Sequence, residues 1–118
     1  MNDCIFCKII KNEVPTEVIF ENDEFLAFPA KDQTFKGHIL VIPKKHFENI
    51  FDFEKESLQR LMGVAQIVAK DMISNGATGI NLLHASGKDA QQSVFHFHLH
   101  VVPRYPNDGV DMWLRNIN

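Results

Sequence analysis

Residues Val94–Val102 read VFHFHLHVV, and in this stretch three histidines alternate with apolar residues. Successive side chains of a β-strand point to opposite faces of the sheet. We therefore expect His96, His98 and His100 to share one face of a strand. The opposite face is expected to pack on the core through Phe95, Phe97, Leu99 and Val101. The pattern predicts a strand over 94–103 that ends at a proline, which lacks the N–H group of a sheet ladder.

Outside this strand, the chain shows one long helical pattern and several short extended segments. Apolar residues recur at helical spacing from about Glu54 to Ser74, and Asn75-Gly76 then ends the helix. The other expected elements are a short N-terminal helix at 4–13, with Ile5, Phe6 and Ile9 on its buried side, and strands at 17–22, 24–30, 37–43 and 79–85. Strand and helix do not alternate along this order. It predicts an α+β fold with a largely antiparallel sheet of about five strands, one long helix and a short N-terminal helix.

The composition indicates one soluble globular domain. The chain has 118 residues, of which 45% are hydrophobic and 23% charged, so we expect a single domain over residues 1–118. A net charge of −3 offers no basic surface for nucleic acid. No apolar run approaches the roughly 18 residues of a membrane span, and the start MNDCIFCKII does not resemble a signal peptide. We expect a cytoplasmic protein without nucleic-acid or membrane partners.

Spacing along the strand indicates that the three histidines do not share one task. Positions two apart on a strand are separated by about 6.6 Å, and positions four apart by about 13 Å. His96 and His100 therefore cannot hold the same ion unless the strand bends sharply. A loop rich in hydrogen-bond donors, SGKDAQQSV, precedes the strand and offers Gln92 and Ser93 for an anion such as phosphate. Clustered imidazoles beside such a loop indicate a binding or catalytic site.

Cys4 and Cys7 form a C-x-x-C pair near the N-terminus. The pair fits half of a zinc site, a redox pair or two buried free thiols. The redox alternative requires a preceding strand, and only three residues precede Cys4. A zinc site requires two more ligands, and the candidates are His38, His46, His84 and one histidine of the triplet. Spacing alone does not choose among them, and both His46 and His84 also fit ordinary surface positions.

Four segments together resemble one known family. HFHLHVV is similar to the histidine-triad motif of the HIT proteins, and CIFCKII, GHILVIPKKH and QSVFHFHLHVVPR occur in that family's order and spacing. The resemblance extends from Cys4 to about Trp113, and it is greatest to the bacterial Hint-like branch with a C-x-x-C zinc site. It implies a HIT-like fold. It also implies a homodimer formed through the long helix and a sheet surface.

The resemblance implies a nucleotidyl hydrolase or transferase that acts at the α-phosphate of purine nucleotide derivatives, either nucleoside phosphoramidates or dinucleoside polyphosphates. In this family the middle histidine attacks phosphorus and forms a covalent nucleotidyl-histidine, so His98 is the implied nucleophile. His100 and His38 match positions that contact the phosphate and leaving group. The implied nucleotide contacts are Ile5, Phe6, Ile9, Phe28, Leu40, Gln92 and Ser93. The implied ligands of a structural zinc are Cys4, Cys7, His46 and His96.

Three positions depart from the family pattern. Ala30 stands where the family carries an acidic residue that grips the ribose, and Asp32 lies two residues further on. Ala85 replaces an asparagine on the phosphate side, and Gln91 replaces the glycine of a Gly-Gln-Ser/Thr motif. These departures favour an alternative function, a nucleotide-binding or protein-interaction module with weak or no turnover. A metalloenzyme with H-x-H as catalytic ligands is a third alternative, which the 13 Å estimate disfavours.

Overall fold

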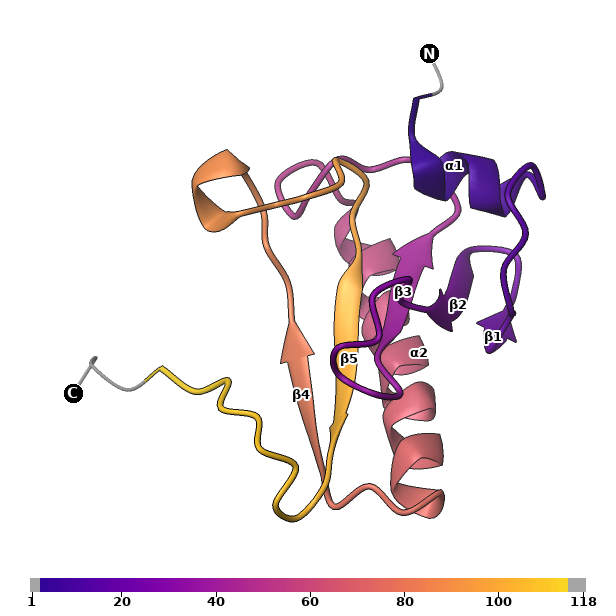
Figure 1. Cartoon of the computed structure of the whole chain (residues 1–118). Helices are drawn as coiled ribbons and strands as arrows, with labels where there is room; N and C mark the ends of the chain where they lie inside the picture. The colour runs from indigo at the N-terminus through magenta and orange to yellow at the C-terminus, as the bar shows by residue number, and fades with distance from the viewer. Residues whose placement is uncertain (1–2, 115–118) are drawn as a thin grey trace.

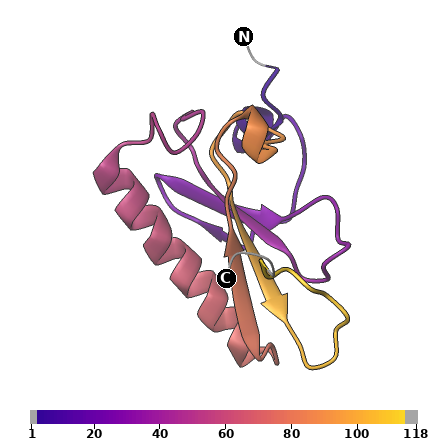
Figure 2. The same cartoon turned by 90° about the vertical axis from the view of Figure 1, so that its left-hand side faces the viewer.

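The computed structural model describes residues 3–114, and the ends of the predicted 1–118 domain lie outside this range. One antiparallel sheet of five strands carries the long helix α2 (Lys55–Ser74) along one face (Figures 1 and 2). The strand order is β1-β2-β3-β5-β4. The strands are β1 (Phe20–Glu21), β2 (Phe25–Pro29), β3 (Ile39–Pro43), β4 (Gly79–Leu83) and β5 (Leu99–Arg104). This architecture confirms the predicted α+β fold.

The two remaining helices lie at the same end of the molecule. They are α1 (Ile5–Ile10) and the 3₁₀-helix η1 (Lys88–Ala90), and both appear at the top of Figure 1. The loop between β3 and α2 also reaches this end (Figure 1). Among the described residues, no helix is both long enough and apolar enough to cross a membrane.

The central strands are buried on both faces, because each face contributes to a different core. Val41 belongs to the large core beneath α2, whereas its neighbour Leu40 belongs to a smaller core with α1. Side chains of a strand alternate between faces, so a strand covered on both sides is apolar at every position. In β5, a histidine interrupts this pattern of apolar residues at every position. Leu99 and Val101 join the core beneath α2, and His100 lies between them, opposite Leu40 of β3.

The predicted strand at 94–103 begins later than the alternating pattern indicated. β5 starts at Leu99, and the chain before it bends. A strand requires a neighbour to pair with, and neither neighbouring strand pairs with residues before Leu99: β3 pairs with β5 no further than Val41, and β4 ends at Leu83. The prediction that Phe95 is a core residue was wrong, because the bend leaves 45% of its surface exposed.

The other predicted elements are confirmed in type, with differences at their ends. β1 has two residues, and β5 continues through Pro103 to Arg104, where it pairs with β4. α1 spans six residues and begins after Cys4, whose Sγ accepts a hydrogen bond from the backbone N–H of Cys7. In α1, Phe6 is the buried residue, whereas Ile5, predicted to be buried, is 40% exposed. The helix is too short to bury more than one narrow stripe.

Candidate functional site

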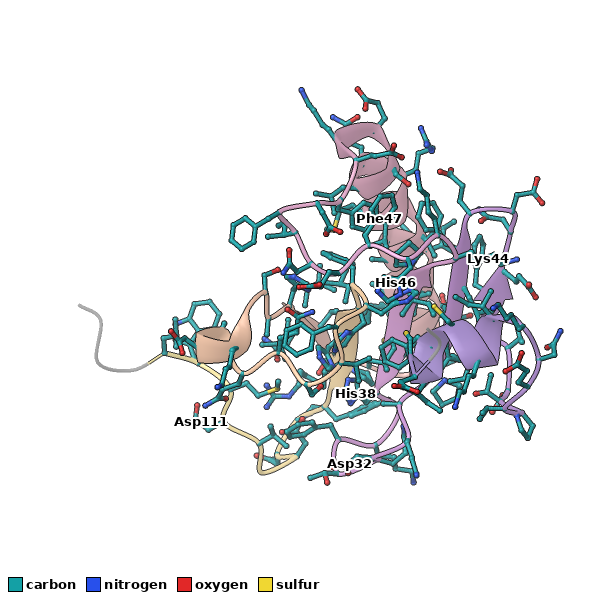
Figure 3. All side chains as sticks on the ribbon, turned by 90° about the horizontal axis from the view of Figure 1, so that it is seen from above. Asp32, His38, Lys44, His46, Phe47 and Asp111 are labelled. Carbon is teal, nitrogen blue, oxygen red and sulfur yellow. The ribbon has the colours of Figure 1, made fainter. Side chains whose placement is uncertain are left out.

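Four potential metal ligands from three separate segments meet at the α1 end of the sheet. Cys4 and Cys7 come from α1 and its start, His46 from the loop after β3, and His96 from the bend before β5. One ligand atom from each residue lies within 4.8 Å of all the others. Figure 3 shows His46 with sulfur atoms beside its ring. The structure therefore brings together the four residues that the family resemblance implied as zinc ligands.

Four of the separations between these atoms are close to those of a tetrahedral zinc site. With Zn–N near 2.0–2.1 Å and Zn–S near 2.3 Å, ligand atoms should be roughly 3.3–3.8 Å apart. The Nδ1 atoms of His46 and His96 are 3.1 Å apart, and Cys7 Sγ lies 3.2 Å from His46 Nδ1 and 3.6 Å from His96 Nδ1. Cys4 Sγ lies 3.4 Å from His96 Nδ1. Two thiols and two imidazoles are also the ligand types that zinc prefers.

Hydrogen bonding fixes the orientation of the His96 ring. Its Nε2–H donates to the carbonyl oxygen of Pro43 at 2.8 Å, so the lone pair of Nδ1 faces the cysteines. A second hydrogen bond of this kind is typical of metal-binding histidines. Burial lowers the pKa of His96 to about 4, which keeps the ring neutral. Burial, reinforced by the neighbouring Cys4, raises the pKa of the Cys7 thiol to about 11. A bound divalent cation would stabilise the thiolate and lower this pKa.

Three further histidines, His38, His98 and His100, line a separate cavity of about 730 Å³ beside α1. His98 is 4% exposed, and its Nδ1–H donates to the carbonyl oxygen of His96 at 2.8 Å. This hydrogen bond leaves Nε2 without a proton. Burial lowers the pKa of His98, so its ring remains neutral near pH 7. An imidazole in this state is a nucleophile and a base.

His38 and His100 form a hydrogen-bonded pair in the same cavity. Nε2 of His38 and Nδ1 of His100 are 2.8 Å apart, so one of them donates a proton to the other. Burial lowers the pKa of His38, and burial together with the nearby histidines lowers that of His100 to about 4. Both rings contact the cavity, where His98 also lies. The three imidazoles can therefore bind an anionic group and exchange protons with it.

The apolar wall of the cavity is made by the residues predicted to contact a nucleotide. They come from α1, β2 and β3 and comprise Ile5, Phe6, Ile9, Phe28 and Leu40. Phe6 is central to this wall, because its ring packs edge-on against those of Phe28 and His98. Ser93 also lines the cavity, as do His38, His98 and His100.

Gln92 differs from the other predicted nucleotide contacts, because it is not part of the described cavity lining. Its side chain is buried, and its Oε1 accepts from the backbone N–H of Gly87 at 2.8 Å. Its Nε2 donates to the carbonyl oxygens of Glu48 and Val94 at 2.7 and 3.0 Å. All polar atoms of the amide are thus occupied by backbone groups. Gln92 shapes the loop that carries Ser93.

The rim of the cavity reflects the departures from the family pattern. Ala30 is 7% exposed and lines the cavity as an apolar residue. Asp32 also lines it, but its Oδ1 accepts hydrogen bonds from the backbone N–H and the hydroxyl of Thr34 at 2.9 and 2.5 Å. These bonds lower the pKa of Asp32. In Figure 3, Asp32 lies on the outer loop, further from the centre than His38.

Sequence reasoning missed several residues near the site. Four of them line the cavity from loops that carried no recognisable motif: Val14, Pro15, Thr16 and Lys31. His84, which the sequence offered as a candidate zinc ligand or an ordinary surface residue, lies outside the described cluster of Cys4, Cys7, His46 and His96. Its ring instead stacks on Phe97, with centroids 4.2 Å apart, and contacts the backbone of His98. The signal for His84 was its position directly after β4, the strand that pairs with β5.

Comparison with known proteins agrees with the family resemblance found in the sequence. The model of the HIT domain matches residues 11–107. The Protein hit of Bacillus subtilis is 40% identical over 104 residues, which cover 87% of this chain and 72% of that protein. An adenosine 5'-monophosphoramidase of Saccharomyces cerevisiae is 40% identical over 101 residues, covering 86% and 62%. The crystal structure of a Zn-bound histidine triad family protein from Mycobacterium smegmatis aligns with a TM-score of 0.89 and 34% identity, covering 97% and 84%.

Proposed function

The chain belongs to the HIT family, and from this premise we propose that it is a nucleotidyl hydrolase or transferase acting at the α-phosphate of purine nucleotide derivatives. The observation that carries the proposal is the state of His98. Its Nδ1–H is held by a backbone carbonyl, and its neutral ring faces a cavity with an apolar wall. The relative named as an adenosine 5'-monophosphoramidase supports nucleoside phosphoramidates as one substrate class. Dinucleoside polyphosphates are the other class that we propose.

In the proposed reaction, Nε2 of His98 attacks the α-phosphorus and the bond from phosphorus to the leaving group breaks. The base and ribose lie against the apolar wall that contains Phe6, and the phosphate lies toward Ser93. The neutral His38–His100 pair relays a proton from water to the departing amine or phosphate oxygen. A second water molecule then attacks the nucleotidyl-His98, releases the nucleotide 5'-monophosphate and gives up a proton to solvent through the same pair. Splitting the reaction in this way replaces one difficult displacement with two easier ones.

Zinc has a structural role in this proposal. Cys4, Cys7, His46 and His96 would occupy all four positions of a tetrahedral site, so the ion would be closed to substrate. When bound, it supplies cross-linking and no Lewis-acid step. It ties α1 to the loop after β3 and to the bend before β5. Since Phe6 lies in α1 between the two cysteines, the ion also holds the apolar wall of the cavity in place.

We further propose that the protein is a cytoplasmic homodimer. β4 is an edge strand, and its Leu82 and Leu83 are 45% and 38% exposed. Exposed apolar residues on an unpaired edge favour association with a second chain. Ile67 of α2 is 52% exposed as well, consistent with an interface that includes the long helix. Zinc ligation by reduced cysteines suits a reducing compartment. Light scattering during size-exclusion chromatography measures the mass, and a monomer at micromolar concentration would contradict this proposal.

A second candidate function is a nucleotide-binding module with weak turnover. The observation that favours it is Ala30, which gives the rim of the cavity an apolar residue in place of a carboxylate, while Asp32 is engaged with Thr34. Weaker ribose contacts would lower affinity and misplace the α-phosphate. The intact set of His38, His98 and His100 favours the enzyme over this alternative.

The experiment that separates the two functions measures AMP release by the wild type and by His98→Ala. The substrates are a fluorogenic adenosine phosphoramidate and, separately, diadenosine tetraphosphate. Turnover by the wild type and none by the variant supports the enzyme, and intact-mass detection of an adenylylated wild-type chain would identify the intermediate. Nucleotide binding by calorimetry without turnover of either substrate would support the binding module instead.

A further inference from the structure

The backbone carbonyl of His98 lies just beyond the last paired residues of β5. β5 pairs with β3 as far as Leu99 and with β4 as far as His100. Neither strand therefore provides a backbone partner opposite His98. Buried carbonyl groups in proteins are almost always hydrogen-bonded, because losing water without a new partner is unfavourable. The partner of this carbonyl must come from outside the sheet.

That partner is the side chain of His84. Nδ1 of His84 lies 3.0 Å from the carbonyl oxygen of His98, and since a carbonyl only accepts, Nδ1–H is the donor. His84 directly follows Leu83, the last residue of β4. Its ring also stacks on Phe97, with an angle of 23° between the ring planes. The imidazole thus extends the contact between β4 and the catalytic segment beyond the end of the backbone ladder.

A second hydrogen bond holds the opposite edge of the His84 ring. Nε2 of His84 and Oγ of Ser86 are in hydrogen-bond contact, and the same Oγ accepts from the backbone N–H of Ile50 at 2.9 Å. The serine hydroxyl is then free to donate its proton to Nε2, which leaves the ring proton on Nδ1. The three hydrogen bonds form one directed chain, from Ile50 through Ser86 and His84 to His98. Hydrogen bonds arranged in such a chain strengthen one another.

We propose that His84 is a positioning residue for the nucleophile His98, an inference that rests on the proposed function. His98 is held at two points: its side-chain Nδ1–H by the carbonyl of His96, and its own carbonyl by His84. The first contact sets the rotation of the ring, and the second sets the peptide group from which the ring projects. His84 is absent from the described lining of the cavity. It therefore acts through His98 and not on the substrate.

Two substitutions separate the hydrogen bond from the packing of the ring. His84→Phe keeps an aromatic ring on Phe97 and removes the Nδ1–H donor. His84→Asn removes the ring and keeps an N–H donor, because Nδ2 of asparagine branches from Cγ as Nδ1 of histidine does. Ser86→Ala is the third variant, and it removes the hydroxyl that fixes the ring proton on Nδ1.

We expect His84→Phe to lower kcat for the adenosine phosphoramidate by about 10- to 100-fold, the effect of a small displacement of a reacting group. KM should stay within about twofold, since the cavity lining is unchanged. His84→Asn should retain kcat within about threefold of the wild type, and Ser86→Ala should fall between the two. A wild-type kcat for His84→Phe, or equal losses for the phenylalanine and asparagine variants, would overturn the inference. Metal content and circular dichroism are measured on each variant to establish that it is folded.

A readout without turnover keeps this inference separate from the proposed function. Long-range ¹⁵N–¹H correlation spectra of the wild type report which nitrogen of each histidine carries the proton. We expect His84 and His98 both in the Nδ1–H form, and we expect the His98 ring signals to shift in His84→Phe. His84 in the Nε2–H form, or unchanged His98 signals, would contradict the positioning role even if the protein proves inactive. Absence of turnover with the expected spectra would instead refute only the enzyme function.

Discussion

His96 and His98 are two residues apart and both are buried, yet they present opposite nitrogen atoms to their sites. His96 donates its Nε2–H to the carbonyl of Pro43 and turns Nδ1 toward the cysteines. His98 donates its Nδ1–H to the carbonyl of His96 and leaves Nε2 free. In the proposed function, the same side chain thus serves as a metal ligand in one case and as a nucleophile in the other. The backbone carbonyl that each ring finds decides which nitrogen is available.

The two sites also differ in how their protons are controlled. In the metal cluster, a cation would compensate the buried thiolates, so the ligands need no proton exchange. In the cavity, His38 and His100 share a hydrogen bond and can pass a proton to a leaving group. In the proposed function, one region would therefore serve stability and the other would serve chemistry. The predictions below separate these two contributions, beginning with the largest expected effect.

Replacing the nucleophile should abolish chemistry without disturbing the metal cluster. In His98→Asn, the amide N–H can still donate to the carbonyl of His96, but no nucleophilic nitrogen remains. We expect kcat to fall at least about a thousandfold, with one zinc per chain retained and Tm changed by only a few degrees. Steady-state kinetics and elemental analysis of the purified variant provide the test. Loss of zinc together with activity would mean that the two sites are one functional unit.

Removing a metal ligand should have the reverse effect, with stability affected first. Cys7→Ser eliminates one of four ligands, and we expect zinc content to fall below half an equivalent. If zinc is present at a thousand times its Kd, losing it removes about 4 kcal/mol of stabilisation. Thermal unfolding with and without a strong chelator measures this loss, and chelation should affect the wild type far more than Cys7→Ser. Equal sensitivity of both proteins to the chelator would contradict a structural zinc at this cluster.

Much of the division between the metal cluster and the cavity could be predicted from the sequence, but not the bend before β5 that creates it. The order of strands and helices predicted the antiparallel sheet, and the family resemblance supplied the ligand set. The 13 Å spacing argument correctly indicated that His96 and His100 would not share one ion, since His96 lies in the metal cluster and His100 lines the cavity. The bend before β5 was not predicted. The position of that bend depends on where β3 and β4 stop pairing with β5, which is a tertiary property. Phe95 was therefore placed in the core by a local pattern that does not extend to it.

The role of His84 and the placement of Gln92 were not predictable for a related reason. Both residues use their side chains to satisfy backbone groups of distant segments, His84 at His98 and Gln92 at Glu48. Nothing in the local sequence records which carbonyl will lack a partner. Polar side chains of this kind can be recognised only after the backbone hydrogen bonds have been traced.

Restoring an acidic residue at the rim should improve ribose recognition without changing the metal cluster. Ala30→Asp places a carboxylate on the cavity wall, where it can accept from a ribose hydroxyl. One hydrogen bond contributes about 1 kcal/mol, so KM for an adenosine phosphoramidate should fall about fivefold. The matched substrate is the corresponding 2',3'-dideoxy compound, for which KM should not improve. An equal change for both substrates would show that the carboxylate acts by altering the cavity and not by contacting the ribose.

The pH dependence should reveal the neutral state of the nucleophile. Burial lowers the pKa of His98 below 6.5, so its reactive neutral form persists as the solution is acidified. We expect the acid limb of kcat/KM to lie below pH 6.5, with less than about a twofold change between pH 7 and 8. Burial lowers the pKa of His100 to about 4 in the folded chain, so the unfolded chain binds more protons between pH 4 and 6.5. Stability should therefore decline as the pH falls through this window. An acid limb above pH 7 would contradict a neutral buried nucleophile.

The smallest effect concerns the loop that carries Ser93 into the cavity. Gln91 has φ = 70°, in the left-handed region where a side chain is unfavourable, and it stands where the family motif has glycine. Gln91→Gly should raise the free energy of unfolding by about 0.5–1 kcal/mol, because the relief of strain exceeds the entropy that glycine loses on folding.

Gly87→Ala is the matched control: φ at Gly87 is 97°, and the added methyl meets no atom within 4 Å, so its destabilisation reports backbone strain alone. Urea unfolding of both variants measures the two opposite shifts. Since the loop belongs to the catalytic region, neither variant should change the zinc content, and a loss of metal from either would show that strain in this loop is transmitted to the metal cluster.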